Sequence, residues 1–290
     1  MFRKLVWLPV ASLLSACSPL GLVNAVSHVY SVDEQRDISY GSLPRQKLDI
    51  YLPRDYGEAS LPVILFFYGG SWNSGSRQDY RFVGRRLAHE GYITVVADYR
   101  LYPDVRFPDF LNDSALALRK TAELMRSDEF SRYHPQQRIT LMGHSAGAYN
   151  AAMLALDKRW LEGVGLEREE TINGWIGFAG PYDLYPITVE EVKPVFFHPQ
   201  YPADSNPVDF VENAVVPSLL LVPAEDDLVS PQKNTWALQN KLRAADKKSD
   251  AIEITGTNHS TIIGTLSPVL FFKGSSMTEV NRFIHNVGTD

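Results

Sequence analysis

Short, continuous apolar segments alternate along this chain with segments whose apolar residues have helical spacing. Residues 62–68 and 92–97 are apolar runs of strand length, which suits strands that are buried on both faces of a sheet. Residues 110–125 follow the second run and repeat apolar side chains every three or four positions, as an amphipathic helix does. This alternation predicts an α/β fold with a mostly parallel central sheet flanked by helices on both faces.

The remaining segments extend the same pattern over one large domain. Residues 38–40 and 47–51 alternate apolar and polar side chains around a turn and predict an antiparallel hairpin. The stretch 184–213 breaks the rhythm with prolines and aromatic residues, and it is either a surface connection or a lid or substrate-binding insertion. Further strands are expected at 138–142, 171–179, 216–223 and 251–255, and further helices at 79–90, 146–156, 233–245 and 277–287.

The N-terminus has the layout of an export signal. Two basic residues precede an apolar run at 5–14, which is about half of the roughly 20 residues that a membrane-spanning helix needs. The following Leu-Ser-Ala-Cys sequence, which ends at Cys17, resembles the lipobox of bacterial lipoproteins. The resemblance implies a signal peptide at 1–16, a lipid anchor on Cys17, and a place in the bacterial cell envelope, on the outer membrane facing the periplasm or the exterior. The alternative is an ordinary secretory signal with an incidental cysteine.

The sequence thus divides into the signal peptide, a tether at 17–35 and a folded domain at 36–290. Cys17 is the only cysteine, so the folded domain has no internal disulfide, no cysteine nucleophile and no cysteine ligand for zinc. The net charge of -6 gives no support to nucleic-acid binding, which favours a basic surface.

The strongest local signal for chemistry is Gly-His-Ser-Ala-Gly at residues 143–147. It matches the G-x-S-x-G nucleophile elbow, in which a sharp turn between a strand and a helix presents a serine. The predicted strand 138–142 and the alanine-rich helix 146–156 supply that setting. Ser145 is therefore the predicted nucleophile.

A serine hydroxyl needs a base, and the base needs an acid that orients it. Of the seven histidines, His259 lies in a loop just after the last predicted strand, where the active site of an open parallel sheet forms. His144 lies inside the elbow, and we expect its side chain to point elsewhere. Three acidic residues, 225–227, follow the predicted strand 216–223. Their spacing before a valine resembles the hydrolase pattern G-x-x-D-x-x-V, which favours Asp226 as the acid, with Asp227 as the alternative.

Residues 67–72, Phe-Tyr-Gly-Gly-Ser-Trp, resemble the H-G-G-x-W segment of hormone-sensitive-lipase-like and related carboxylesterases, with tyrosine in place of the histidine. The resemblance implies that the backbone N–H groups of Gly70 and Ser71 join that of Ala146 in an oxyanion hole. Residues 97–101 similarly resemble a D-Y-R-L stretch of these enzymes, in which we expect Asp98 and Arg100 to form an ion pair.

Together these motifs resemble the α/β-hydrolase superfamily, of the carboxylesterase and lipase type that includes feruloyl and acetyl esterases. The resemblance covers about residues 36–288 and implies a serine esterase that cleaves a small-molecule ester through Ser145, His259 and Asp226, with no cofactor. One alternative is an amide or formamide hydrolase, or a peptidase, of the same fold. The other is a non-catalytic, surface-anchored binding protein on this scaffold.

Overall fold

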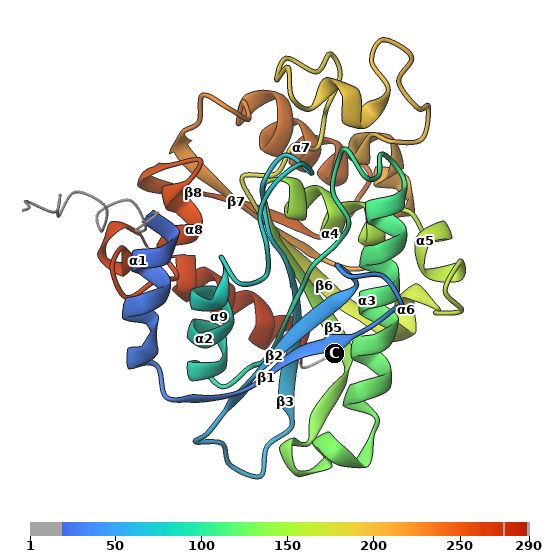
Figure 1. Ribbon diagram of the computed structural model, residues 1–290. Coiled ribbons are helices and arrows are strands. Elements are labelled where there is room, and N and C mark those ends of the chain that lie inside the picture. Colours follow the sequence, from blue (N-terminus) through green and yellow to red (C-terminus); the bar gives the residue numbers. More distant parts are fainter. Residues whose placement is uncertain (1–18, 275, 289–290) are drawn as a thin grey trace, which may run out of the picture.

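The computed structural model describes residues 19–274 and 276–288 and confirms the predicted α/β fold (Figure 1). Within that part of the chain, eight strands form one sheet in the order β1-β2-β4-β3-β5-β6-β7-β8. The pairs β1–β2 and β2–β4 are antiparallel, and every later pair is parallel. The strands are β1 (Val32–Ser39), β2 (Lys47–Pro53), β3 (Leu61–Phe67), β4 (Ile93–Ala97), β5 (Pro135–His144), β6 (Ile172–Phe178), β7 (Ser218–Glu225) and β8 (Ser249–Asn258).

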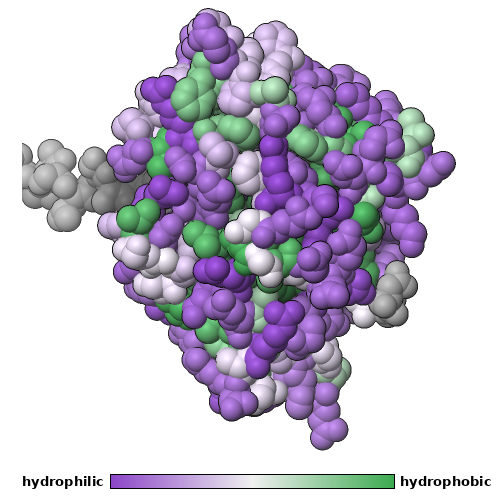
Figure 2. Space-filling view, turned by 90° about the vertical axis from the view of Figure 1, so that its right-hand side faces the viewer, coloured by the Kyte–Doolittle hydropathy of each residue, from purple (hydrophilic) through white to green (hydrophobic). Residues whose placement is uncertain are grey.

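Helices cover both faces of this sheet. The helices α3 and α4 pack on one face, and α2 and α9 pack on the other (Figure 1). The surface on the side of α3, α5 and α6 is mostly hydrophilic, and its hydrophobic side chains form small separate groups (Figure 2). The helices are α1 (Pro19–Val26), α2 (Arg81–His89), α3 (Asp109–Met125), α4 (Ala146–Leu156), α5 (Arg159–Glu162), α6 (Arg168–Thr171), α7 (Ala237–Ala244), α8 (Thr261–Gly264) and α9 (Ser276–Val287).

The strands and the helix at the centre of the fold are buried because nearly all of their residues are apolar. All residues of β4 and β6 are buried, as expected for largely apolar strands that lie between two helix layers. All residues of α4 are buried as well, and its many alanines let the helix pack closely against β5 and β6. This packing fixes α4, and therefore the turn that precedes it, at the centre of the molecule.

Residues 19–35 differ from the predicted tether, because they form α1, a short 3₁₀ turn and the start of β1. The side-chain amide of Asn24 donates to the carbonyls of Gln78 and Asp79 and accepts from the N–H of Phe82. These polar bonds hold α1 to the start of α2, while Leu20 and Val23 also pack on the core. Two such apolar contacts in so short a helix leave no clear hydrophobic periodicity in the sequence here. The predicted signal peptide and Cys17 lie outside the described residues. None of the helices that the structure describes is long and apolar enough to cross a bilayer.

The predicted ion pair between Asp98 and Arg100 is wrong. Asp98 is buried and accepts from the guanidinium and the backbone N–H of Arg77, while Arg100 donates to Asp113 on α3 at 2.8 Å. The strand β4 ends at Ala97, so strand geometry does not continue through these residues, and each side chain takes a partner from another element.

Candidate active site

Ser145 occupies the sharp turn between β5 and α4. Its backbone has φ 53° and ψ -122°, which is a strained conformation for a residue with a side chain. The flanking glycines are required by close packing. A Cβ atom on Gly147 would lie 2.0 Å from the carbonyl oxygen of Phe67, and one on Gly143 would lie 2.2 Å from the carbonyl oxygen of Gly147. The turn therefore depends on both glycines of the predicted elbow.

The structure brings Ser145, His259 and Asp226 into one hydrogen-bonded row. Nε2 of His259 lies 2.9 Å from Oγ of Ser145, and Nδ1 lies 2.8 Å from Oδ2 of Asp226. These residues follow β5, β8 and β7, so they meet at the carboxyl edge of the parallel sheet. Within the described chain, neither Glu225 nor Asp227 has a hydrogen bond to His259. Of the three acidic residues, Asp226 is therefore the one that contacts the histidine.

The backbone of the following turn fixes the Asp226 carboxylate. Its Oδ1 atom accepts from the N–H groups of Leu228 at 2.9 Å and Val229 at 2.7 Å, which leaves Oδ2 for the imidazole. The Asp226 side chain is 1% exposed and that of His259 is 13% exposed. An ordered, buried carboxylate of this kind can hold the imidazole in one orientation and stabilise it when it is protonated.

His144 has a positioning role that sequence reasoning missed. Its Nε2 lies 2.9 Å from the carbonyl oxygen of His259 and its Nδ1 lies 3.1 Å from the hydroxyl of Tyr80. A carbonyl only accepts, so Nε2 carries the proton and Nδ1 accepts from the phenol. Burial, and then the nearby His259 ring, lower the pKa of His144 to about 3, so it stays neutral. The only sign of this role in the sequence was the presence of a histidine directly before the elbow serine.

The predicted oxyanion-hole residues lie beside the nucleophile. Within the described hydrogen-bond network, no bond uses the N–H of Gly70 or Ser71. Ala146 is the first residue of α4, where the helix leaves its N–H groups free and carries partial positive charge. The loop that carries Gly70 passes close to the elbow, since a Cβ on Gly69 would lie 2.9 Å from Cβ of Ser145. The N–H groups at these three positions are therefore available to an oxygen that develops negative charge next to Ser145.

Tyr68, which replaces the histidine of related segments, holds this loop from behind. Its ring is fully buried and stacks on Tyr99 at 4.7 Å between ring centroids. Its hydroxyl accepts from Arg45 at 2.6 Å, and its carbonyl accepts from the hydroxyl of Tyr99 at 2.7 Å. Burial raises the pKa of Tyr68 far above its ordinary value, so the phenol remains protonated. We therefore assign Tyr68 to loop positioning.

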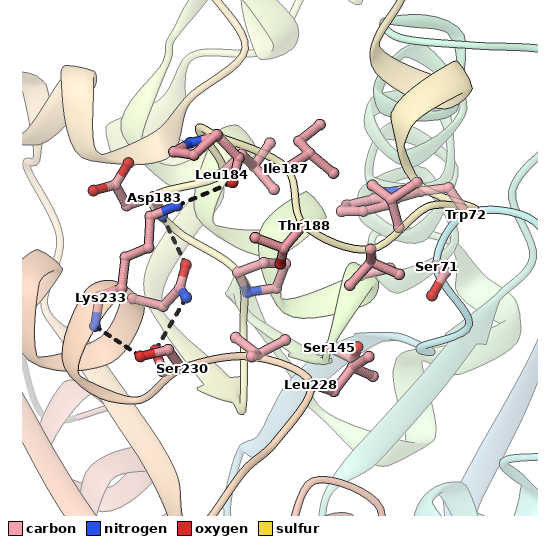
Figure 3. A pocket seen from close by; sticks show the side chains of 17 residues that line it. Ser71, Trp72, Ser145, Asp183, Leu184, Ile187, Thr188, Leu228, Ser230 and Lys233 are labelled. Atoms are coloured by element: carbon pink, nitrogen blue, oxygen red, sulfur yellow. Dashed lines mark hydrogen bonds between the residues drawn. The ribbon is translucent and has the colours of Figure 1, made fainter. Parts of the chain in front are cut away.

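A cavity of about 180 Å³ opens beside Ser145 and is lined mainly by apolar side chains (Figure 3). Trp72 forms one wall, and its indole N–H donates to Asn150 of α4 at 3.0 Å. Lys233 and Asp183 lie at the side of the cavity away from Trp72 (Figure 3). Partial burial lowers the pKa of Lys233, and the nearby Asp183 carboxylate opposes that effect.

The stretch 184–213 supplies much of the cavity wall. Its first part lines the cavity, and the 3₁₀ turn Lys193–Phe196 then buries Phe196, whose ring contacts Trp72 at 5.0 Å between centroids. The stretch therefore packs on the core and lines the cavity, and its role as a lid or substrate-binding insertion stays a prediction. Among the residues that the structure describes, no group of three or more His, Cys, Asp or Glu side chains could hold a metal ion.

The sheet order, the strand–turn–helix at Ser145 and the histidine and aspartate loops at one sheet edge define an α/β-hydrolase. The BD-FAE family model matches residues 48–242, more than half of the chain, and the chain belongs to that family.

Curated relatives and solved structures are consistent with this assignment. The chain is 26% identical to the isoprenylcysteine alpha-carbonyl methylesterase of Arabidopsis thaliana, over 82% of this chain and 59% of the relative. It is also 26% identical to the kynurenine formamidase of Danio rerio, over 79% of this chain and 76% of the relative. The chain thus spans about three fifths of the length of the first of these relatives. Esterase B from Lactobacillus rhamnosis shares the fold, with a TM-score of 0.73 and 17% identity over 93% of this chain and 92% of that chain.

Proposed function

We propose that this chain is a serine hydrolase that cleaves carboxylic esters, with Ser145 as nucleophile, His259 as base and Asp226 as the orienting acid. The observation that carries the proposal is the hydrogen-bonded row of these three side chains, with distances of 2.9 and 2.8 Å, at the edge of an apolar cavity. The similarity to the isoprenylcysteine alpha-carbonyl methylesterase of Arabidopsis thaliana and to the esterase LipC of Mycobacterium tuberculosis supports ester hydrolysis.

The first half-reaction forms an acyl-enzyme. The Ser145 oxygen attacks the ester carbonyl carbon while its proton passes to Nε2 of His259, and the carbonyl electron pair moves onto oxygen. Backbone N–H groups of Gly70, Ser71 and Ala146 stabilise that oxyanion, and each such donor is typically worth a factor of about 10²–10³ in rate. The imidazolium then gives its proton to the departing oxygen, which leaves as the alcohol.

The second half-reaction releases the acid. A water molecule attacks the acyl carbon while His259 takes one of its protons, and the oxyanion forms again at the same backbone donors. When this intermediate collapses, His259 returns the proton to the Ser145 oxygen and the carboxylic acid departs. Asp226 stabilises the imidazolium in both halves by accepting from its Nδ1–H.

A second candidate is the hydrolysis of a formamide or another amide. The similarity to a kynurenine formamidase favours it, because that relative matches this chain over 76% of its own length. The same side chains would act, and His259 would protonate a departing nitrogen instead of an oxygen. Ester and amide substrates therefore have to be compared directly.

We also propose that the enzyme is held in the cell envelope by a lipid on Cys17. The proposal rests on the sequence from Leu14 to Cys17. Mass spectrometry of the mature N-terminus tests it. A mass that includes acyl chains on Cys17 supports the anchor, and an unmodified cysteine or an intact signal rules it out.

The test of the chemistry is the hydrolysis of p-nitrophenyl acetate, butyrate and octanoate, beside formanilides, by the wild type and Ser145→Ala. Loss of a serine nucleophile typically removes on the order of 10⁶ in kcat. Turnover of esters that falls to background in the variant supports the proposal. Turnover of formanilides alone would favour the second candidate. Equal activity in the wild type and the variant, or failure of a fluorophosphonate to label Ser145, would refute the role of Ser145. If the wild type shows neither labelling nor turnover, a non-catalytic binding protein would be favoured.

A further inference from the structure

The helix α1 lies at the mouth of the active site. Leu20 of α1 lines the same surface depression as Ser145, His259 and Ser260, so this helix and the start of α8 border the entrance together. Arg85 of α2 reinforces the position of α1, since its guanidinium donates to the carbonyl of Asn24 at 3.1 Å. The helix is therefore a fixed part of the entrance.

Apolar side chains on this side of the molecule are exposed to solvent. Leu22 of α1 is 55% exposed, and Phe271 and Phe272, in the turn that follows α8, are 59% and 70% exposed. Figure 1 draws α1 and the segment after β8 on the same side of the molecule, away from the mostly hydrophilic surface of Figure 2. We call the exposed residues Leu22, Val26, Phe271 and Phe272 the α1 face.

The chain that leads into α1 indicates what covers this face. No Asp, Glu, Lys or Arg occurs between Lys4 and Asp33, so residues 5–32, which include α1, carry no Asp, Glu, Lys or Arg charge. Cys17 precedes Leu20 by only three residues, and three residues of extended chain span at most about 11 Å. The point where a lipid would be attached to Cys17 is therefore within that distance of a residue that borders the active-site entrance.

We propose that the α1 face rests on a lipid bilayer, so that the entrance to the active site opens at the membrane surface. Exposed Leu and Phe side chains can enter the boundary between headgroups and acyl chains, and a lipid anchor and an apolar patch together hold a protein far more firmly than either alone. The preferred substrates are then amphiphilic esters whose ester group lies at that boundary and whose apolar part fits the cavity. This substrate assignment rests on the proposed ester hydrolysis, whereas the orientation on the bilayer does not.

The first experiment measures the orientation without using turnover. The full chain, purified from membranes and reconstituted into phosphatidylethanolamine–phosphatidylglycerol vesicles with brominated acyl chains, carries either Phe272→Trp or the control Val215→Trp. Val215 is also an exposed apolar residue, but it lines a depression bordered by Val216, Pro217 and Val287, outside the α1 face. Brominated lipid is expected to quench the added fluorescence at position 272 by at least about twofold and that at 215 by far less, because only the α1 face enters the lipid. Equal quenching at both positions, or none at 272, would overturn the proposal.

The second experiment tests the consequence for substrates. Phe271→Asp combined with Phe272→Asp is expected to slow hydrolysis of a long-chain p-nitrophenyl ester held in the vesicles by about tenfold, and to change turnover of p-nitrophenyl acetate in water by less than about twofold. Val215→Asp is the matched control and is expected to change neither rate. An equal loss on both substrates would indicate a structural defect and count against the proposal, as would an unchanged rate on the vesicle ester. If the wild type hydrolyses neither ester, the proposed function fails, while the quenching result still decides the orientation.

Discussion

Replacement of the buried His144 by glutamine is expected to remove part of the acid sensitivity of the folded domain. His144 is buried between Tyr80 and the His259 loop, and this burial lowers its pKa from about 6.5 to about 3. The unfolded chain exposes this imidazole and binds a proton once the pH falls below about 6.5. The folded chain does not bind that proton until the pH approaches 3.

The sign and size of the effect follow from this difference. Between the two pKa values the unfolded state holds one more proton, so stability rises with pH and is lost as the pH falls, by about 1.4 kcal/mol per pH unit. From about pH 7.5 to about pH 5, His144 alone is expected to lower the free energy of unfolding by about 2 kcal/mol. Glutamine does not titrate and can still donate to the His259 carbonyl, so the variant lacks this contribution.

Urea unfolding at the two pH values, followed by tryptophan fluorescence, measures the difference for each protein. The wild type is expected to lose about 2 kcal/mol more than His144→Gln on acidification. His285→Gln removes an exposed histidine of α9 and is expected to behave as the wild type does. If the wild type and His144→Gln lose the same free energy, His144 is not a buried neutral imidazole, and the reasoning fails.

Three further variants test the site and its support. Asp226→Asn is expected to lower kcat by about 10⁴ with little change in stability, because the amide favours the wrong imidazole tautomer; a loss below tenfold would reject the role of Asp226. Gly147→Ala is expected to abolish activity or folding, since the new methyl would meet the Phe67 carbonyl at 2.0 Å, and a soluble, fully active variant would contradict the close packing. Arg77→Met is expected to lower the free energy of unfolding by about 3–5 kcal/mol, because it leaves buried carboxylates without their partner. Arg54, which forms an exposed ion pair with Asp33, supplies the control: Arg54→Met is expected to lower the free energy of unfolding by less than about 1 kcal/mol. Urea unfolding of both variants measures the two losses.

The site residues that the sequence identified share one property: each follows a strand that can be recognised from its own residues. Ser145 and Asp226 come directly after β5 and β7, whose apolar runs mark them, and His259 comes directly after β8. Because parallel strands end at one edge of a sheet, chain order alone brings these loops together. The hydrogen-bonded arrangement of Ser145, His259 and Asp226 then follows from the order of the strands in the fold, without any contact being predicted from the sequence.

The contacts that the sequence did not identify join residues far apart along the chain. Asn24 holds α1 through backbone groups more than 50 residues away, and Asp98 takes its partner from Arg77 rather than from the nearby Arg100. His144 acts on the carbonyl of a residue 115 positions later. No local period or motif encodes such contacts, so only the folded structure shows them.

The helix α4 links the chemistry of the site to its cavity. It begins directly after Ser145, and one turn further on Asn150 accepts from the indole N–H of Trp72, the residue that forms a cavity wall. The side-chain amide of Asn150 in turn donates to the hydroxyl of Ser114 of α3 at 3.3 Å. Both hydrogen bonds of Asn150, to Trp72 and to Ser114, are buried. Another part of the wall comes from residues 184–192, which have no hydrogen bond to the catalytic row. Changes on the Trp72 side should therefore disturb the nucleophile together with the cavity, whereas changes in 184–192 should alter substrate preference alone.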